Sequence, residues 1–237
     1  VLEKVKNGVL DVLFPVICFG CGKEGTYICE KCEGFVGEAA FICPVCQQSS
    51  FTGERHSRCT ARDGLDGLVS IWEYEGFVKK FISQIKYQGA THAMQEIGER
   101  AFGVMAQNIS RATPFFSFLL SGDTYITYVP MAKSKEKKRG FNQAVCLARA
   151  LGNIAKKEVF SLLHKIKDTP SQTELDKEQR LKNVKDSFRY IARIRAPQNA
   201  VLVDDIWTTG ATLKECCKVL KKAGVEKVWG FTLARTV

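Results

Sequence analysis

The chain has 237 residues, of which 45% are hydrophobic and 25% are charged, and its formal net charge is +10 at pH 7. This hydrophobic content is enough to form a core, and no apolar run is long enough to span a membrane, so an integral membrane protein is excluded. The chain is too long for one minimal domain and too short for two full enzymatic domains. We therefore expect two units of unequal size.

Charge divides sharply along the chain. Residues 1–70 hold seven Lys or Arg and nine Asp or Glu, which gives a net charge of −2. Residues 71–237 hold 28 Lys or Arg and 16 Asp or Glu, which gives a net charge of +12. The positive charge therefore belongs to the second unit, where it suits a highly anionic substrate or a nucleic-acid surface. The weak charge of the first unit favours a structural role over nucleic-acid recognition.

The first unit is dominated by closely paired cysteines. Eight potential ligands form four pairs, and each pair is separated by two residues: Cys18 and Cys21, Cys29 and Cys32, Cys43 and Cys46, His56 and Cys59. This spacing is typical of structural zinc sites, and eight ligands suffice for two tetrahedral ions. Pairing in sequence order and a crossed pairing both remain open, as do a single occupied site and an iron–sulfur cluster.

Disulfide bonds are the alternative interpretation of these cysteines. The apolar stretch after Lys4 and Lys6 is interrupted by Asp11 and Pro15, and no signal-peptide cleavage site follows it. We therefore expect a cytoplasmic protein, in which disulfides are disfavoured and zinc is the better interpretation. The remaining cysteines, Cys146, Cys216 and Cys217, lie on helical patterns and are expected to be ordinary buried or half-buried thiols.

The second unit begins with alternating strand and helix patterns. In chain order they predict a strand at 68–75, a helix from 77 to a stop near Gly89, a helix at 92–110 and a strand at 124–129. A basic loop at 131–139 and a helix at 141–156 follow. The loop contains Lys133, Lys135, Lys137, Lys138 and Arg139, which suit a pyrophosphate group. A solvated basic loop is the alternative.

A further strand is predicted at 159–164, followed by a long polar segment at 165–186. A polar segment of this length inside a compact domain is often a lid over an active site. An exposed helix over 174–182 is compatible with that role.

The most informative stretch is residues 201–213, Val-Leu-Val-Asp-Asp-Ile-Trp-Thr-Thr-Gly-Ala-Thr-Leu. Its apolar start predicts a buried parallel strand, and Asp204 and Asp205 stand at the carboxyl end, where open α/β sheets bind ligands. A helix at 212–223 follows, and its N-terminus favours a phosphate. Gly210 lets the backbone curl around that phosphate, and the acids suit sugar hydroxyls or Mg²⁺. An Asp-rich turn with a Thr cap is the alternative. A last strand is predicted at 225–233.

This residue order resembles the signature of type I phosphoribosyltransferases, which bind 5-phosphoribosyl-1-pyrophosphate (PRPP). The resemblance implies that Asp204 and Asp205 contact the ribose hydroxyls. It also implies that the loop holds the 5′-phosphate through Thr208, Thr209, Gly210, Ala211 and Thr212.

The whole chain resembles the ComF/ComFC family, phosphoribosyltransferase-like proteins associated with bacterial DNA uptake and natural transformation. The resemblance rests on motifs spread along the sequence: Phe14-Pro15, the paired cysteines, Ile85-Lys86-Tyr87, Val129-Pro130, Arg139 to Gln143, Thr169 to Gln172, Leu175, Arg180, Asn183 and Asp204 to Thr212. It implies an α/β type I phosphoribosyltransferase fold, a parallel-sheet core with flanking helices, at 67–237. It also implies an N-terminal helix and zinc-finger domain at 1–66. His56, where the family usually has a cysteine, and the bulky Trp207 depart from the pattern.

The family resemblance also implies a function. We expect PRPP and Mg²⁺ to bind, with Arg139, Lys133 and Lys86 near the pyrophosphate, Gln172 and Arg180 arriving with the lid, and the acid pair stabilising an oxocarbenium-like ribose. Single-stranded DNA and a competence helicase or DNA-processing protein are the expected partners. A catalytically silent PRPP sensor, a DNA-binding module or a scaffold is the alternative, and nothing in the sequence identifies the acceptor.

Overall fold

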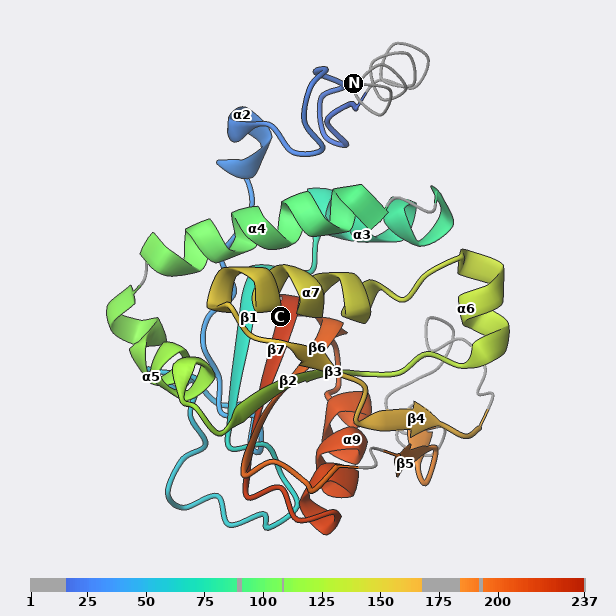
Figure 1. The fold of residues 1–237 in the computed structure, drawn as a ribbon. Coiled ribbons are helices and arrows are strands. Elements are labelled where there is room, and N and C mark those ends of the chain that lie inside the picture. Colours follow the sequence, from blue (N-terminus) through green and yellow to red (C-terminus); the bar gives the residue numbers. More distant parts are fainter. Residues whose placement is uncertain (1–15, 89–90, 108, 168–183, 192–193, 237) are drawn as a thin grey trace.

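The fold is built on a parallel sheet, as the computed structural model shows for residues 16–88, 91–107, 109–167, 184–191 and 194–236. Five strands lie in the order β1-β7-β6-β2-β3, and each neighbouring pair is parallel (Figure 1). Their bounds are β1 Gly67–Glu73, β2 Thr124–Tyr128, β3 Val159–Phe160, β6 Asn199–Trp207 and β7 Lys227–Arg235. A separate antiparallel pair joins β4 Leu163–Lys165 to β5 Phe188–Tyr190.

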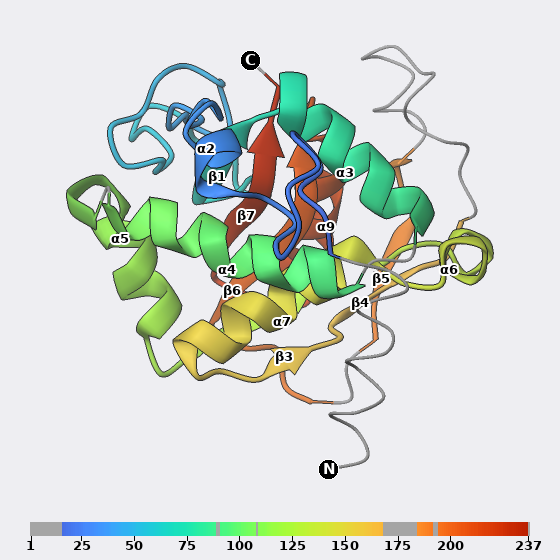
Figure 2. The same cartoon turned by 90° about the horizontal axis from the view of Figure 1, so that it is seen from above.

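Helices cover both faces of this sheet. They are α2 Glu30–Glu33, α3 Gly76–Gln88, α4 Thr91–Gln107, α5 Ile109–Leu120, α6 Lys133–Arg139, α7 Gln143–Ala155 and α9 Ala211–Lys222. The helices α3, α4 and α7 pack on one face and α9 packs on the other (Figures 1 and 2). No helix in the described ranges is long and apolar enough to cross a membrane. The predicted α/β class is therefore confirmed.

Strand β6 lies inside the sheet and is buried on both faces. Val201 and Val203 belong to the core under α4 and α7, whereas Leu202 belongs to the core under α9. Side chains alternate along a strand, so the next two residues continue this pattern and point to opposite faces. Asp204 therefore projects toward the α9 side and Asp205 toward the α7 side.

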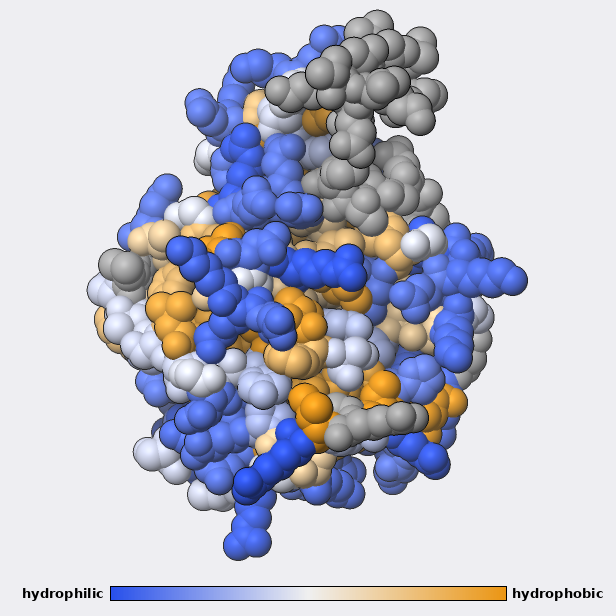
Figure 3. Space-filling model, viewed as in Figure 1, coloured by the Kyte–Doolittle hydropathy of each residue, from blue (hydrophilic) through white to orange (hydrophobic). Residues whose placement is uncertain are grey.

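The predicted loop at 131–139 is wrong: residues Lys133–Arg139 form the short helix α6. Glu136 lies in its first turn and three cations lie in its last turn, an order that the helix dipole favours. Gly140, in the left-handed conformation at φ 82°, ends the helix, and its N–H donates to the carbonyl of Glu136 at 2.8 Å. Hydrophilic side chains cover this corner of the molecule (Figure 3).

Other predicted elements hold with shifted ends, and some were missed. The strand at 159–164 is two strands, because β3 pairs with β2 while β4 pairs with β5. Helix α5 and strand β5 were not predicted. Most of the polar segment at 165–186, including Gln172 and Arg180, lies outside the described residues, so the lid stays a prediction.

The cysteine-rich segment, residues 16–66, lies along the edge of the sheet that β1 forms. The N–H of Ala39 donates a hydrogen bond to the carbonyl of Ile71 in β1. In the opposite direction, the N–H groups of Glu73 and Leu68 in β1 donate to the carbonyls of Gly37 and Gly53, respectively. These bonds occupy backbone groups that an edge strand otherwise leaves unpaired. The two predicted units therefore share backbone hydrogen bonds, and a domain boundary at residue 66 remains a prediction.

A half-buried carboxylate attaches the end of this segment to the sheet. Asp66 accepts hydrogen bonds from Lys221 Nζ at 2.7 Å and from the N–H of Val228 at 2.8 Å, and it forms an ion pair with Arg55 at 3.1 Å. These donors come from α9, β7 and the cysteine-rich segment. One side chain thus links three parts of the molecule.

We predict that Asp66→Ala lowers the free energy of unfolding by about 2 kcal/mol, because it removes the charged partner of Lys221 and leaves the backbone N–H of Val228 without its acceptor. Urea denaturation followed by circular dichroism measures the change. Asp63→Ala removes an exposed carboxylate three residues away and is the matched control, expected to stay within about 0.5 kcal/mol. Equal losses in both variants would contradict the role assigned to Asp66.

Candidate functional site

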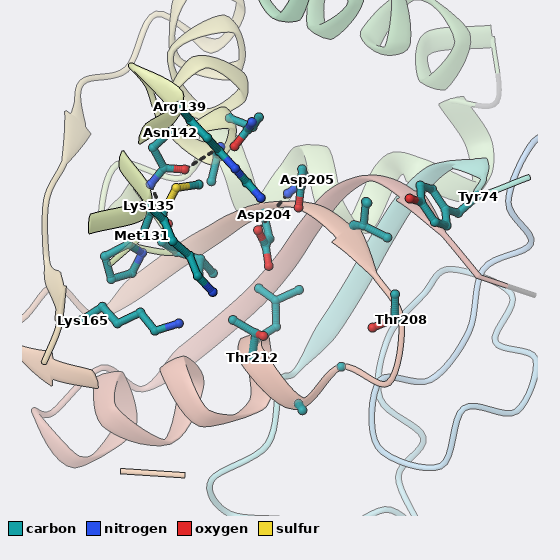
Figure 4. Close-up of a pocket in the computed structure, with 18 of the residues that line it drawn as sticks. Tyr74, Met131, Lys135, Arg139, Asn142, Lys165, Asp204, Asp205, Thr208 and Thr212 are labelled. Atoms are coloured by element: carbon teal, nitrogen blue, oxygen red, sulfur yellow. Dashed lines mark hydrogen bonds between the residues drawn. The ribbon is translucent and has the colours of Figure 1, made fainter. Parts of the chain in front are cut away.

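A cavity of about 570 Å³ opens at the carboxyl ends of the parallel strands. It is lined by Tyr74 after β1, by residues 129–131 after β2, by residues of β6 and the following loop, and by Thr236 after β7. Parallel strands all end at the same edge of a sheet, so segments distant in sequence meet there. Figure 4 shows how the side chains converge on this space.

The loop that follows β6 forms one wall of the cavity. Thr208, Gly210, Ala211 and Thr212 line it. Gly210 is the N-cap of α9 with φ +74°, a backbone conformation that glycine adopts at little cost. Thr209, which is not among the lining residues described, accepts a hydrogen bond on Oγ1 from the N–H of Ala211 at 3.3 Å. We call residues 208–212 the phosphate loop.

Trp207 lies directly beneath the phosphate loop. It is fully buried, and a Cβ atom placed on Gly210 would lie 2.3 Å from its ring. Gly210 is therefore required by its backbone angle and by this contact. The Trp207 ring thus supports the backbone of the phosphate loop.

The two acids stand at the centre of the cavity. Both line it, and Asp204 Oδ1 accepts a hydrogen bond from the N–H of Asp205 at 2.9 Å. Their side chains leave opposite sides of the strand, as Figure 4 shows. Carboxylates in this arrangement are suited to sugar hydroxyls or to Mg²⁺, which prefers oxygen ligands.

Cations line the cavity wall beside the acids. Lys135 and Arg139 lie four residues apart on α6, so they share a face of the helix and both line the cavity. Lys133 is exposed and is not among the lining residues described, so its assignment to the site stays a prediction. A loop could present any of these cations to the cavity, whereas α6 presents only the cations on one of its faces. Lys165, from β4, joins them.

Several lining residues were not identified from the sequence. They come from α3, from β4 and from the positions just after β1 and β7: Tyr74, Lys79, Ser83, Lys165 and Thr236. Lys79 and Ser83 share a face of α3, and their four-residue spacing was a usable signal. Lys86 continues that helix, but its side chain lies outside the described part of the structure.

The start of α7 forms the floor beside the cations. Asn142 caps the helix by accepting from the N–H of Ala144 at 3.0 Å, and its amide donates to the carbonyl of Val129 at 3.0 Å. Gln143 is 1% exposed and lines the cavity, and its Nε2 has no hydrogen-bond partner within the described ranges. Buried amide donors are rarely left unpaired, so an anionic ligand is a suitable acceptor.

Two groups of four ligands occur in the cysteine-rich segment. The first is Cys18, Cys21, Cys29 and Cys32, and the second is Cys43, Cys46, His56 and Cys59; within each group the ligand atoms lie within 4.8 Å of one another. In the first, Cys21 Sγ and Cys29 Sγ are 3.6 Å apart. Sulfurs bound at about 2.3 Å to a tetrahedral zinc ion have a similar separation. Both groups fit Zn²⁺, and each joins ligands that are consecutive in sequence.

The surroundings of the ligands favour metal binding. In the second group His56 turns Nδ1 toward Cys46, at 3.4 Å, while Nε2 lies 3.0 Å from the carbonyl of Ser49, an outer contact that orients the ring. Burial raises the pKa of the Cys18 thiol, but backbone hydrogen bonds from Cys21 and Cys29 outweigh burial, and the pKa falls to about 6. Cys18 therefore reaches the thiolate form that binds zinc at neutral pH.

Comparison with known proteins agrees with this architecture. A model of the phosphoribosyl transferase domain matches residues 137–235, which include the acids and the phosphate loop. The protein "Competence protein ComFC" of Bacillus subtilis is 26% identical over 223 residues, covering 90% of this chain and 86% of that protein. "DNA utilization protein YhgH" of Salmonella typhimurium is 25% identical, covering 89% and 91%. Along about 90% of its length the chain is therefore similar to the ComFC and YhgH proteins.

A third relative matches a shorter part of the chain. "Competence protein F" of Haemophilus influenzae is 34% identical over 110 residues, which span 45% of this chain and 48% of that protein. The matches that cover about 90% of the chain extend beyond the phosphoribosyl transferase domain into the cysteine-rich segment. A phosphoribosyl transferase domain joined to a zinc-finger-like segment is thus the architecture of this chain.

We predict that Lys135→Ala and Arg139→Ala each weaken pyrophosphate binding about tenfold, because each removes a charge-assisted hydrogen bond inside the cavity. Titration calorimetry with inorganic pyrophosphate measures the affinity. Lys133→Ala removes the same charge from an exposed position on the same helix and should change the affinity less than twofold. An equal loss in all three variants would indicate a general charge effect instead of contacts with the ligand.

We predict two zinc ions per chain, one in each ligand group, because each group offers four donors. Plasma emission spectrometry of the purified protein counts them. Cys18→Ser and Cys43→Ser should each remove one ion, whereas Cys146→Ser, outside both groups, should remove none. Loss of both ions in either single variant would show that the two groups do not act separately.

Proposed function

We propose that the protein binds PRPP together with Mg²⁺ in the 570 Å³ cavity and cleaves its bond to pyrophosphate during transfer of the phosphoribosyl group. One observation carries this proposal. Asp204 and Asp205 lie between a glycine-capped helix N-terminus on one side and Lys135 and Arg139 on the other, around a single cavity. The cavity volume falls in the range of small-molecule sites.

Each part of PRPP has a chemically suitable wall. The 5′-phosphate fits the phosphate loop, where the N-terminus of the 12-residue helix α9 supplies N–H groups and a favourable dipole. The ribose hydroxyls fit the carboxylates of Asp204 and Asp205. The pyrophosphate fits Lys135, Arg139 and the unpartnered amide of Gln143.

The proposed chemistry depends on charge. As the bond from the anomeric carbon to pyrophosphate breaks, positive charge develops on the ribose and negative charge on the leaving group. Asp204 or Asp205 stabilises the ribose, while Lys135 and Arg139 stabilise the pyrophosphate. Mg²⁺, when bound, neutralises phosphate oxygens, and the acid pair is the oxygen-rich group suited to hold it.

A second candidate function is nucleic-acid binding without turnover. Residues 71–237 carry a net charge of +12, and relatives are named for competence and DNA utilization. Pyrophosphate release, assayed with PRPP, Mg²⁺ and pooled bases, amines and single-stranded DNA, decides between the two. Steep salt dependence of DNA binding without pyrophosphate release would favour the second candidate.

We predict that Asp205→Ala abolishes PRPP binding in titration calorimetry with Mg²⁺, because the ribose hydroxyls and the metal lose a charged acceptor. Asp123→Ala removes an exposed carboxylate at the start of β2, far along the strand from the cavity, and should bind PRPP as the unaltered protein does. Unchanged affinity of Asp205→Ala would overturn the proposed site.

A further inference from the structure

The second ligand group lies against the phosphate loop. Gln47 directly follows the ligand Cys46, and its Nε2 donates a hydrogen bond to the carbonyl of Thr209 at 3.5 Å. Thr209 belongs to the phosphate loop, 162 residues away in sequence. A residue of the cysteine-rich segment thus contacts the backbone of the candidate binding site.

This contact bears on the orientation of one peptide group. In a trans peptide the carbonyl and the following N–H point in opposite directions. The carbonyl of Thr209 is directed toward Gln47, so the N–H of Gly210 is directed the other way, and Gly210 lines the cavity. Gln47 therefore favours the peptide orientation that presents an N–H group to an anion.

The neighbouring carbonyls of the same stretch are held from outside as well. The N–H of Thr236 donates to the carbonyl of Trp207 at 2.9 Å, and its Oγ1 donates to the carbonyl of Thr208 at 3.4 Å. Three successive carbonyls, those of Trp207, Thr208 and Thr209, are thus occupied by groups from β7's end and from Gln47. The contact of Gln47 completes this set.

The position of Gln47 depends on the turn that carries two ligands. Its N–H donates to the carbonyl of Cys43 at 2.8 Å, and the N–H of Cys43 donates to the carbonyl of Gln48 at 2.9 Å. Gln47 has φ 63°, in the left-handed region. A metal ion held by Cys43 and Cys46 would fix this turn, and with it the start of the Gln47 side chain.

The same turn packs beside helix α9. A groove of about 470 Å³ is lined by Pro44 and Val45 of the turn and by Ala211 and Lys214 of the first turn of α9. Ala211 also lines the larger cavity. Ala211 of the phosphate loop is therefore shared by the cavity and by the groove beside the second ligand group.

The first ligand group has different neighbours. Thr26, within that group's loop, donates to Glu96 of α4 at 2.7 Å, and Glu33 pairs with Arg100 of α4 at 3.2 Å. These contacts join the first ligand group to α4 and not to the phosphate loop. The first group serves as an internal reference for the second group.

We propose that Gln47 is a positioning residue for the phosphate loop, and that it couples metal binding by the second ligand group to anion binding at the loop. Linkage is reciprocal: a metal ion that orders Gln47 strengthens anion binding, and a bound anion retains the metal by the same factor. The coupling to anion binding rests on the proposed function, whereas the role of Gln47 in positioning the phosphate loop does not.

Hydrogen exchange on the zinc-loaded protein without PRPP tests whether Gln47 positions the phosphate loop. Gln47→Ala should raise amide exchange of the peptide covering 207–213 about threefold, as loss of one hydrogen bond allows. Both residues have a Cβ, so the cost of the left-handed backbone is similar. Gln48→Ala, an exposed glutamine one residue later, should leave exchange unchanged. Equal exchange in Gln47→Ala and the unaltered protein would overturn the proposal.

Zinc release to a colorimetric chelator tests the coupling. PRPP with Mg²⁺ should slow release from the second group about threefold and leave the first group unchanged, with Cys18→Ser and Cys43→Ser assigning the two phases. Gln47→Ala should remove the effect of PRPP and weaken PRPP binding about threefold. Equal slowing of both phases, or persistence of the effect in Gln47→Ala, would contradict the coupling. If calorimetry shows no PRPP binding to the unaltered protein, the proposed function fails, and hydrogen exchange alone decides the role of Gln47.

Discussion

The arrangement of the site depends on the burial of one parallel strand. Strand β6 pairs with β2 on one side and β7 on the other, and its first half is enclosed by apolar side chains on both faces. Polar groups can follow only where the strand leaves this core, at its carboxyl end. The adjacent acids Asp204 and Asp205 stand there, and the alternation of the strand sends them to opposite sides.

Electrostatics then separates the cavity into regions of different charge. The phosphate loop offers backbone N–H groups at the start of α9, the acids occupy the centre, and cations approach from α6 and β4. An anionic ligand with a neutral sugar between two phosphate groups matches this order. The tryptophan beneath Gly210 shows that the loop is also shaped by apolar packing, since its ring excludes any larger residue there.

The cysteine-rich segment has few buried apolar side chains of its own and is organised by its ligand groups and by the sheet edge. Metal binding can replace a hydrophobic core in a segment of this size. Backbone bonds to β1 and the carboxylate of Asp66 attach it to the larger unit. The segment reaches the phosphate loop through Gln47.

The sequence by itself determined the elements of strong periodicity, the acid pair, the phosphate loop and the four ligand pairs, because each is written in consecutive or closely spaced residues. Only the tertiary structure decided that residues 133–139 form a helix presenting Lys135 and Arg139 to the cavity while Lys133 faces solvent. It also brought Tyr74, Lys165 and Thr236 to the site. Their roles depend on which strands are neighbours and on which helix face meets the cavity. Those relations arise from packing between distant segments, which no local pattern of residues contains.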